Sequence, residues 1–179
     1  MKKYIIKTAT AVMVLSLFSL NGCILDAFDT LTQNIPYSKE FPLSSSQTTY
    51  SNSQTIDLSS STVYKNYQDK IEEIKFIRAE YRTVSVDPSN LSGNITITLK
   101  DASGNILFSR GLGQLSPSDY IKTPRELELT SAEIGLINSY LSKLSNRILI
   151  ATISISQISP SPYQLVGAID VVFKMKSKT

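Results

Sequence analysis

The chain has 179 residues, of which 41% are apolar and 18% are charged, so it is long enough for one domain and apolar enough to build a core. Serine and threonine together occupy 42 positions, histidine and tryptophan are absent, and there is a single cysteine. This composition excludes a disulfide framework, a zinc site built on cysteine and histidine, and catalysis that needs an imidazole.

The formal net charge of +3 originates at the N-terminus. Three lysines, Lys2, Lys3 and Lys7, precede an uncharged run from Thr8 to Leu20, which is typical of a secretory signal. Without these lysines, 15 basic residues face 15 acidic ones, so the remaining chain is neutral. A neutral body has no general electrostatic attraction to nucleic acid, and we predict no nucleic-acid partner.

The leader closes with Leu20-Asn21-Gly22-Cys23. This motif resembles the lipobox of bacterial lipoproteins, in which a thiol is acylated and the chain is cut just before it. The resemblance implies a signal peptide over residues 1–22, lipidation of Cys23 and attachment to a membrane through N-terminal acyl chains. A transmembrane helix is the alternative, but Asn21 and Gly22 interrupt the run before the about 20 apolar residues that a span needs.

The residue after the predicted acylation site is Ile24. Aspartate at this position is associated with retention of lipoproteins in the inner membrane, so the resemblance favours the outer membrane of a bacterial cell envelope, where there is one. Residues 23–34 would form the lipidated N-terminus and a short tether. Residues 24–33 would reach about 30 Å when extended, or would carry an apolar stripe if helical.

Alternating apolar residues predict an opening strand over Ile35–Leu43. A polar stretch at Ser44–Gln54 is typical of a loop, and a short strand follows at Ile56–Leu58. Apolar spacings of three and four predict a short helix over Tyr64–Ile74, before a long strand at Lys75–Val86.

The middle of the chain contains a hairpin. Asp87–Asn90 predicts a turn, because proline fixes its φ angle and Asp and Asn bond to nearby backbone. Strands at Ile95–Leu99 and Ile106–Arg110 then flank a turn at Asp101–Asn105. The next fifteen residues, Gly111–Arg125, show little periodicity and are predicted to be a loop.

The last third contains a helix between strands. A short strand is predicted at Glu126–Leu129, and the T-x-x-E pattern that begins at Thr130 is a capping box, starting a helix that reaches about Asn146. Two long strands, Ile148–Ile158 and Tyr163–Met175, follow, separated by a proline-containing turn.

Eight strands and two short helices predict a mostly β protein with a single domain over residues 35–179. We expect a β-sandwich, immunoglobulin-like or transthyretin-like, with the helices at its edges. An α+β roll with both helices on one sheet is the alternative.

The residues that could serve in catalysis or metal binding are better explained by structural roles. The chain contains neither a G-x-S-x-G nor an S-x-x-K motif. The pairs Glu72/Glu73 and Glu126/Glu128 could do acid–base work, as in glycosidases, but solvated faces explain them more simply. Asp101–Asn105 could ligate calcium, yet its residues are those of a hairpin turn. We therefore predict no catalytic residue, no metal site and no cofactor.

The long loop at Gly111–Arg125 is the strongest candidate for a contact surface, because loops of this length are often functional and exposed apolar groups mark interfaces. Its candidate partner-contact residues are Leu112, Leu115, Tyr120 and Ile121. The alternative is a crossover whose apolar residues cap the end of the sandwich. The Ser/Thr-rich stretch Ser44–Ser53 is a second candidate.

Taken together, these patterns predict a membrane-anchored envelope lipoprotein that acts as a non-enzymatic binding or assembly module, with another envelope protein as its partner. A carrier that holds a lipid or other apolar ligand is one alternative, and would need a large apolar cavity. A glycan-acting enzyme that uses carboxylates is the other.

Overall fold

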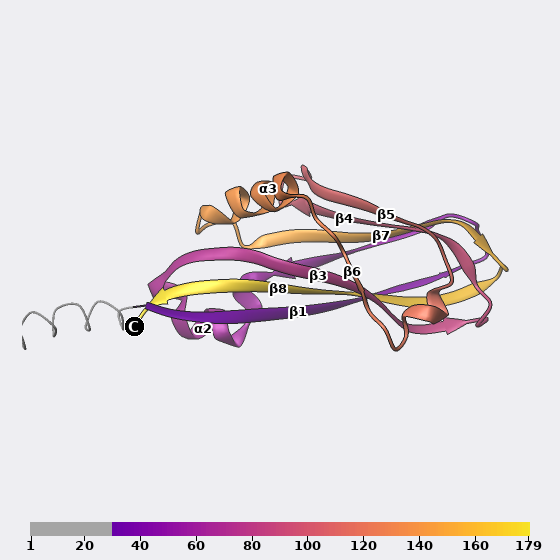
Figure 1. Ribbon diagram of the computed structural model, residues 1–179, viewed down its shortest axis with the longest axis horizontal. Coiled ribbons are helices and arrows are strands. Elements are labelled where there is room, and N and C mark those ends of the chain that lie inside the picture. The colour runs from indigo at the N-terminus through magenta and orange to yellow at the C-terminus, as the bar shows by residue number, and fades with distance from the viewer. Residues whose placement is uncertain (1–29) are drawn as a thin grey trace, which may run out of the picture.

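The computed structural model describes residues 30–179; the predicted signal peptide, Cys23 and the first part of the tether lie outside that range. Two antiparallel sheets of four strands pack face to face (Figure 1). The strands are β1 Thr30–Ser45, β2 Tyr50–Asp57, β3 Ile71–Asp87, β4 Ser92–Asp101, β5 Ile106–Leu115, β6 Arg125–Glu126, β7 Ile148–Ser159 and β8 Tyr163–Lys178. The helices are α2 Thr62–Tyr67 and α3 Ser131–Ser142, with 3-10 turns at Leu58–Ser60, Gln68–Lys70 and Pro117–Tyr120.

The strand order is β1-β8-β3-β6 in one sheet and β2-β7-β4-β5 in the other. An eight-stranded double sheet in this order is a jelly roll, which is built from two Greek keys. The predicted β-sandwich is confirmed. The immunoglobulin-like or transthyretin-like order, and the α+β roll, are not what the structure shows. Alternation reveals which face a strand buries but not which strand lies beside it, so the order was not accessible from the sequence.

Inward-facing side chains of both sheets fill the space between them. Phe173 of β8 packs edge-on against Tyr37 and Phe76, with ring centroids 5.9 and 6.2 Å apart. One cavity between the sheets, lined by Phe76, Ile97 and Phe108 among others, has a volume of about 10 Å³, the room needed for one water molecule. This cavity is too small for the lipid that the predicted alternative, an apolar carrier, would have to hold.

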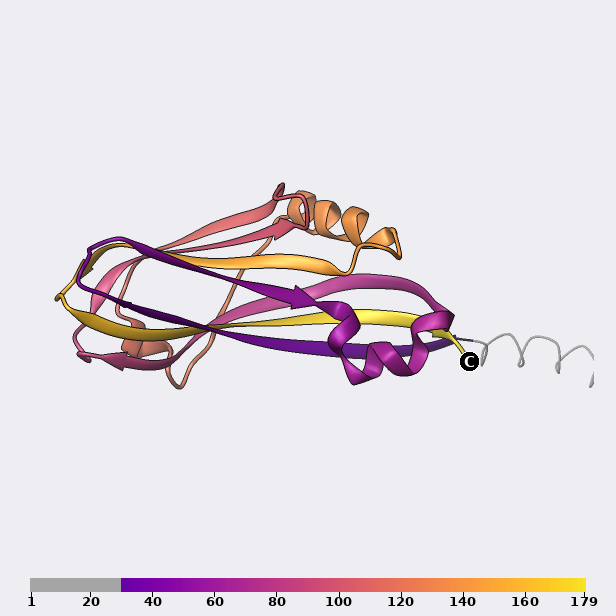
Figure 2. The same ribbon diagram turned by 180° about the vertical axis from the view of Figure 1, so that it is seen from behind.

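Helix α3 closes one open side of the sandwich by bonding to both sheets. The Asn138 carboxamide accepts the backbone N–H of Phe76 in β3 at 2.8 Å, and the Tyr140 hydroxyl donates to the carbonyl of Ile148 in β7 at 2.7 Å. Helix α2 lies over β1 on the other side (Figure 2). There the Tyr37 hydroxyl donates to the carbonyl of Leu58.

Several boundaries differ from the sequence predictions, and three lie in the first half of the chain. β1 begins at Thr30, so residues 30–34 of the predicted tether are already part of the domain, paired with the end of β8. Most of the predicted loop at Ser44–Gln54 is strand, since β2 begins at Tyr50. The predicted helix over Tyr64–Ile74 ends early, and β3 begins at Ile71.

The edge strand β1 contains two prolines, Pro36 and Pro42. The side-chain amide of Asn52 in β2 donates to the carbonyl of Pro42 at 2.8 Å, so the backbone groups of Pro42 face away from β8. Backbone orientation alternates along a strand, so Pro36, six residues earlier, faces the same way.

The molecule is elongated, and its two ends differ (Figure 1). Thr30 pairs with Lys178 at one end of the first sheet, and Ser45 pairs with Tyr163 at the other. The end that contains Thr30 and Lys178 is called the base. The opposite end is called the tip; it comprises residues 44–49, 87–91 and 160–164. The 16 residues of β1 run between the two, a distance of about 50 Å.

Candidate functional site

A pocket of about 310 Å³ opens at the tip, where β1, β3 and β8 end together. We call it the tip pocket. It is lined by Ser44, Ser45, Ser46, Asp87, Pro88, Pro162, Tyr163 and Gln164.

The sheet register brings the polar side chains of the tip pocket together. Gln164 of β8 lies between Ser44 on β1 and Asp87 on β3, and pairs with both. Residues directly opposite in an antiparallel sheet point to the same face, and these three are exposed. A hydroxyl, a carboxamide and a carboxylate therefore stand in one row, about 5 Å apart from strand to strand.

Hydrogen bonds between turns hold the walls of the tip pocket. The Ser161 hydroxyl donates to the carbonyl of Ser46 at 2.7 Å, which joins the β7–β8 turn to the β1–β2 turn. The backbone N–H of Gln47 donates to the Ser45 hydroxyl at 2.8 Å, and that of Leu91 donates to the carbonyl of Pro88 at 3.0 Å. These bonds fix the turns before any ligand is bound.

Tyr163 forms part of the lining and is only 2% exposed. Its hydroxyl is buried beside Ser45. Burial raises the pKa of Tyr163 above its ordinary value of 10.0, because the phenolate would lose its hydration, while a hydrogen bond with the Ser45 side chain acts in the opposite direction. The hydroxyl thus stays protonated at neutral pH.

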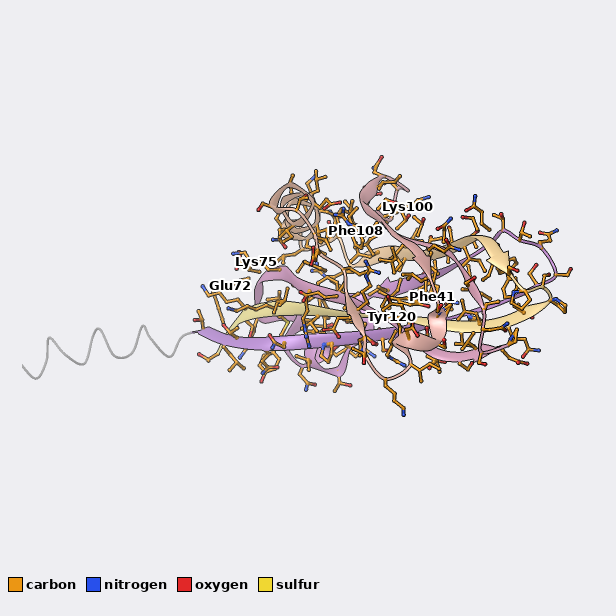
Figure 3. The ribbon with its side chains drawn as sticks, turned by 45° about the vertical axis from the view of Figure 1, so that its right-hand side comes forward. Phe41, Glu72, Lys75, Lys100, Phe108 and Tyr120 are labelled. Carbon is orange, nitrogen blue, oxygen red and sulfur yellow. The ribbon has the colours of Figure 1, made fainter. Side chains whose placement is uncertain are left out.

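The predicted contact loop is largely core. β5 continues to Leu115, so Leu112 and Leu115 point into the sandwich and are 6% and 7% exposed. Tyr120 is half-buried, and its ring packs edge-on against Tyr81 at 6.0 Å (Figure 3). Ile121, at 46%, is the one exposed apolar residue of the four. The alternative interpretation, a crossover whose apolar residues cap the sandwich, describes this segment better.

The second candidate contact segment, Ser44–Ser53, does not form a single structural unit. Ser44, Ser45 and Ser46 line the tip pocket, whereas the stretch from Tyr50 onward belongs to β2. There the Ser53 hydroxyl is hydrogen-bonded to that of Thr152 in β7 at 2.8 Å. Three residues of this stretch thus line the tip pocket, and its last four belong to β2.

Glu72 and Glu73 are paired with lysines. Glu72 lies 3.3 Å from the ammonium of Lys176, and Glu73 lies 2.8 Å from that of Lys75. Figure 3 shows Glu72 and Lys75 at the base, away from the tip pocket. These carboxylates form surface ion pairs, as the simpler interpretation of the sequence expected.

Glu126 and Glu128 line a separate recess of about 130 Å³, together with Arg110 and Arg125. This volume is well below the 300 Å³ or more of ordinary ligand sites, and two guanidinium groups balance the two carboxylates. The recess is therefore small for a ligand site.

The carboxylate of Asp101 accepts its hydrogen bonds from residues of its own turn. Its carboxylate accepts the backbone N–H of Ser103 at 2.8 Å, and both the backbone N–H and the side-chain amide of Asn105, at 2.9 and 2.8 Å. These bonds, that from the Asn105 side chain foremost, hold the pKa of Asp101 below its ordinary value. Over residues 30–179, no three Asp, Glu, His or Cys side chains gather as they would around a metal ion.

The sequence did not reveal the tip pocket, because its polar row comes from three strands far apart along the chain. Ser44, Asp87 and Gln164 each look like ordinary turn or strand-end residues. The register between β1, β8 and β3 is what joins them.

No protein-family profile and no curated protein matches this chain. Solved virus structures are similar to it over most of the chain. An empty head of turnip yellow mosaic virus has a TM-score of 0.44 and 11% identity over 83% of this chain and 82% of that one. A semi-empty virus-like particle of Macrobrachium rosenbergii nodavirus has a TM-score of 0.44 and 12% identity over 84% and 95%. These similarities assign no function to this chain.

Within the described part of the chain, no helix has the length and apolar character that a membrane crossing requires.

Proposed function

We propose that the protein is a lipid-anchored lipoprotein of the bacterial cell envelope, in the outer membrane where there is one, and that it binds another envelope component without catalysis. The observation that supports this proposal is the placement of two features at opposite ends of the molecule: β1 starts at the base, and the tip pocket lies at the tip. Seven Cα–Cα steps separate Cys23 from Thr30, at most about 25 Å. Acyl chains on Cys23 would therefore hold the base near the bilayer, with the tip about 50 Å further out.

The chemistry of the tip pocket favours binding over catalysis. Its lining contains one carboxylate, Asp87, and no cationic or imidazole group. Acid–base hydrolysis of a glycosidic bond by the usual route needs two carboxyl groups across the scissile bond. The preformed turns suit a site that recognises a partner and leaves it unchanged.

Fatty-acid labelling tests the anchor. Cells fed a clickable fatty acid should incorporate it into the full-length protein but not into a Cys23→Ala variant, which lacks the acylated thiol. A Thr30→Ala variant, altered beyond the motif, should be labelled like the wild type. Label on Cys23→Ala, or an unlabelled and freely soluble wild type, would refute the anchor.

Photo-crosslinking in the same cells tests the binding role. A photoreactive residue at Gln47, in the tip, should capture an envelope component, because the tip faces away from the bilayer. The same residue at Gln68, at the base, should capture lipid or nothing. Capture at Gln68 alone would place the binding surface at the wrong end and contradict the proposal.

A further inference from the structure

We propose that the tip pocket is a binding site for a neutral saccharide. This proposal rests on the binding role given above and names the chemical class of the partner. The charge of the lining is the first argument. Asp87 contributes one negative charge, and none of the other lining residues is ionised at neutral pH. A ligand that carries phosphate, sulfate or carboxylate groups would be repelled.

The polarity of the lining is the second argument. Sites for lipids and drug-like molecules are mostly apolar, with a few polar groups. Here the proportion is reversed, since five of the eight lining residues, three serines, Asp87 and Gln164, are hydrophilic. An uncharged ligand rich in hydroxyl groups can match such a surface.

The row Ser44–Gln164–Asp87 supplies the donors and acceptors that a diol needs. A carboxylate accepts from one hydroxyl, a carboxamide both donates and accepts, and a serine hydroxyl does either. Neighbours in the row are about 5 Å apart, so one sugar ring can reach two of them at once. Pro88 and Pro162 add apolar ring faces against which sugar C–H groups can pack.

Preorganisation is the third argument. The Ser161–Ser46 and Gln47–Ser45 hydrogen bonds fix two of the turns, so little ordering remains to be done when a ligand binds. The volume of about 310 Å³ is at the small end of ligand sites and suits about one or two sugar rings.

The test uses the full-length lipidated protein in an amine-oxide detergent, because detergents with sugar headgroups would compete. An array of neutral and acidic oligosaccharides is the probe, and titration calorimetry then measures affinity for the glycan that binds best. We expect binding to neutral members and none to members that are purely anionic. Asp87→Asn and Gln164→Ala should each weaken binding about tenfold, because the first replaces a charged acceptor of the row by a neutral amide and the second removes a carboxamide.

Asp119→Asn is the matched control. Asp119 is an exposed carboxylate in the 3-10 turn after β5, outside the tip pocket, so its removal should leave affinity unchanged. Unfolding midpoints in urea establish that all three variants fold. Absence of binding to every neutral glycan, a preference for anionic glycans, or equal affinity of all three variants and the wild type would each overturn the proposal.

The outcomes also separate this inference from the proposed function. If no saccharide binds but Gln47 captures a protein in cells, the saccharide site is wrong and the binding role stands. If neutral glycans bind at the tip while Cys23 carries no acyl group, the anchor is wrong and the saccharide site stands.

Discussion

Gly167 illustrates how one residue sets the fit between the sheets. It lies on β8, and a methyl group added to its Cα would stand 3.0 Å from the Ile153 side chain of β7 and 3.1 Å from the ring of Tyr81 in β3. Tyr81 is fully buried and hydrogen-bonded to the Thr83 hydroxyl at 3.1 Å, and burial raises its pKa to about 12. The absence of a side chain at Gly167 makes room for that ring.

Gly167→Ala should therefore lower the free energy of unfolding by about 1–3 kcal/mol, the usual cost of overpacking a close-packed core. The measurement is the midpoint of urea unfolding. Gly111→Ala is the control, because the added methyl group there has no atom within 4 Å and the φ angle of Gly111 lies outside the left-handed region. Equal midpoints for both variants would show that the sheets can separate at no cost.

Among the secondary-structure elements, helix α3 is stabilised at its first turn by contacts among Thr130, Glu133 and Arg110. The Thr130 hydroxyl accepts the backbone N–H of Glu133 at 3.2 Å, and the Glu133 carboxylate accepts the N–H of Thr130 at 2.7 Å, which confirms the predicted capping box. Arg110 of β5 lies 2.7 Å from the same carboxylate. The Thr130 N–H above all, with Arg110 in support, holds the pKa of Glu133 below its ordinary value of 4.5.

A folded-state pKa below the unfolded one means that this carboxylate stabilises the protein at neutral pH, and that its contribution disappears as pH falls through the folded-state value. Glu133→Gln keeps the capping geometry but removes the charge. It should lower the free energy of unfolding by about 0.5 kcal/mol at pH 7, and the difference from the wild type should shrink as pH falls below 4.5 and through the folded-state pKa. Urea unfolding of both proteins across this range checks it. Asp101 is present in both and does not affect the comparison. A difference that is constant with pH would contradict the assigned role.

At the scale of the whole molecule, short-range patterns in the sequence predicted the buried face of a strand and the position of a hairpin. The last strand, Tyr163–Met175, buries the face expected of it, and the hairpin around Asp101 is confirmed. Strand order and the tip pocket could not be predicted, because both depend on register between distant segments. The start of the predicted loop at Gly111–Arg125 is strand for a related reason: β5 continues across a bulge, and Leu112, one of the candidate contact residues, is buried.

The orientation of the proposed anchored protein is measurable. Acylation uses the only cysteine of the chain, so a fluorophore attached through Gln47→Cys or Gln68→Cys marks one end alone. In vesicles that contain nitroxide-labelled headgroups, the probe at Gln68 should be quenched and that at Gln47 should not, because about 50 Å separates tip from base. Vesicles without nitroxide are the control. Equal quenching of both probes would mean that the sandwich lies flat on the bilayer.

The two prolines of β1 have a consequence for neighbouring copies of the protein. An open strand edge invites another chain to add its own strand, and such pairing can continue into fibres. Pro36 and Pro42 offer no amide hydrogen on the open side of β1, and Asn52 already occupies one of its carbonyls. The two prolines therefore disfavour the addition of a strand from a neighbouring molecule along the β1 edge.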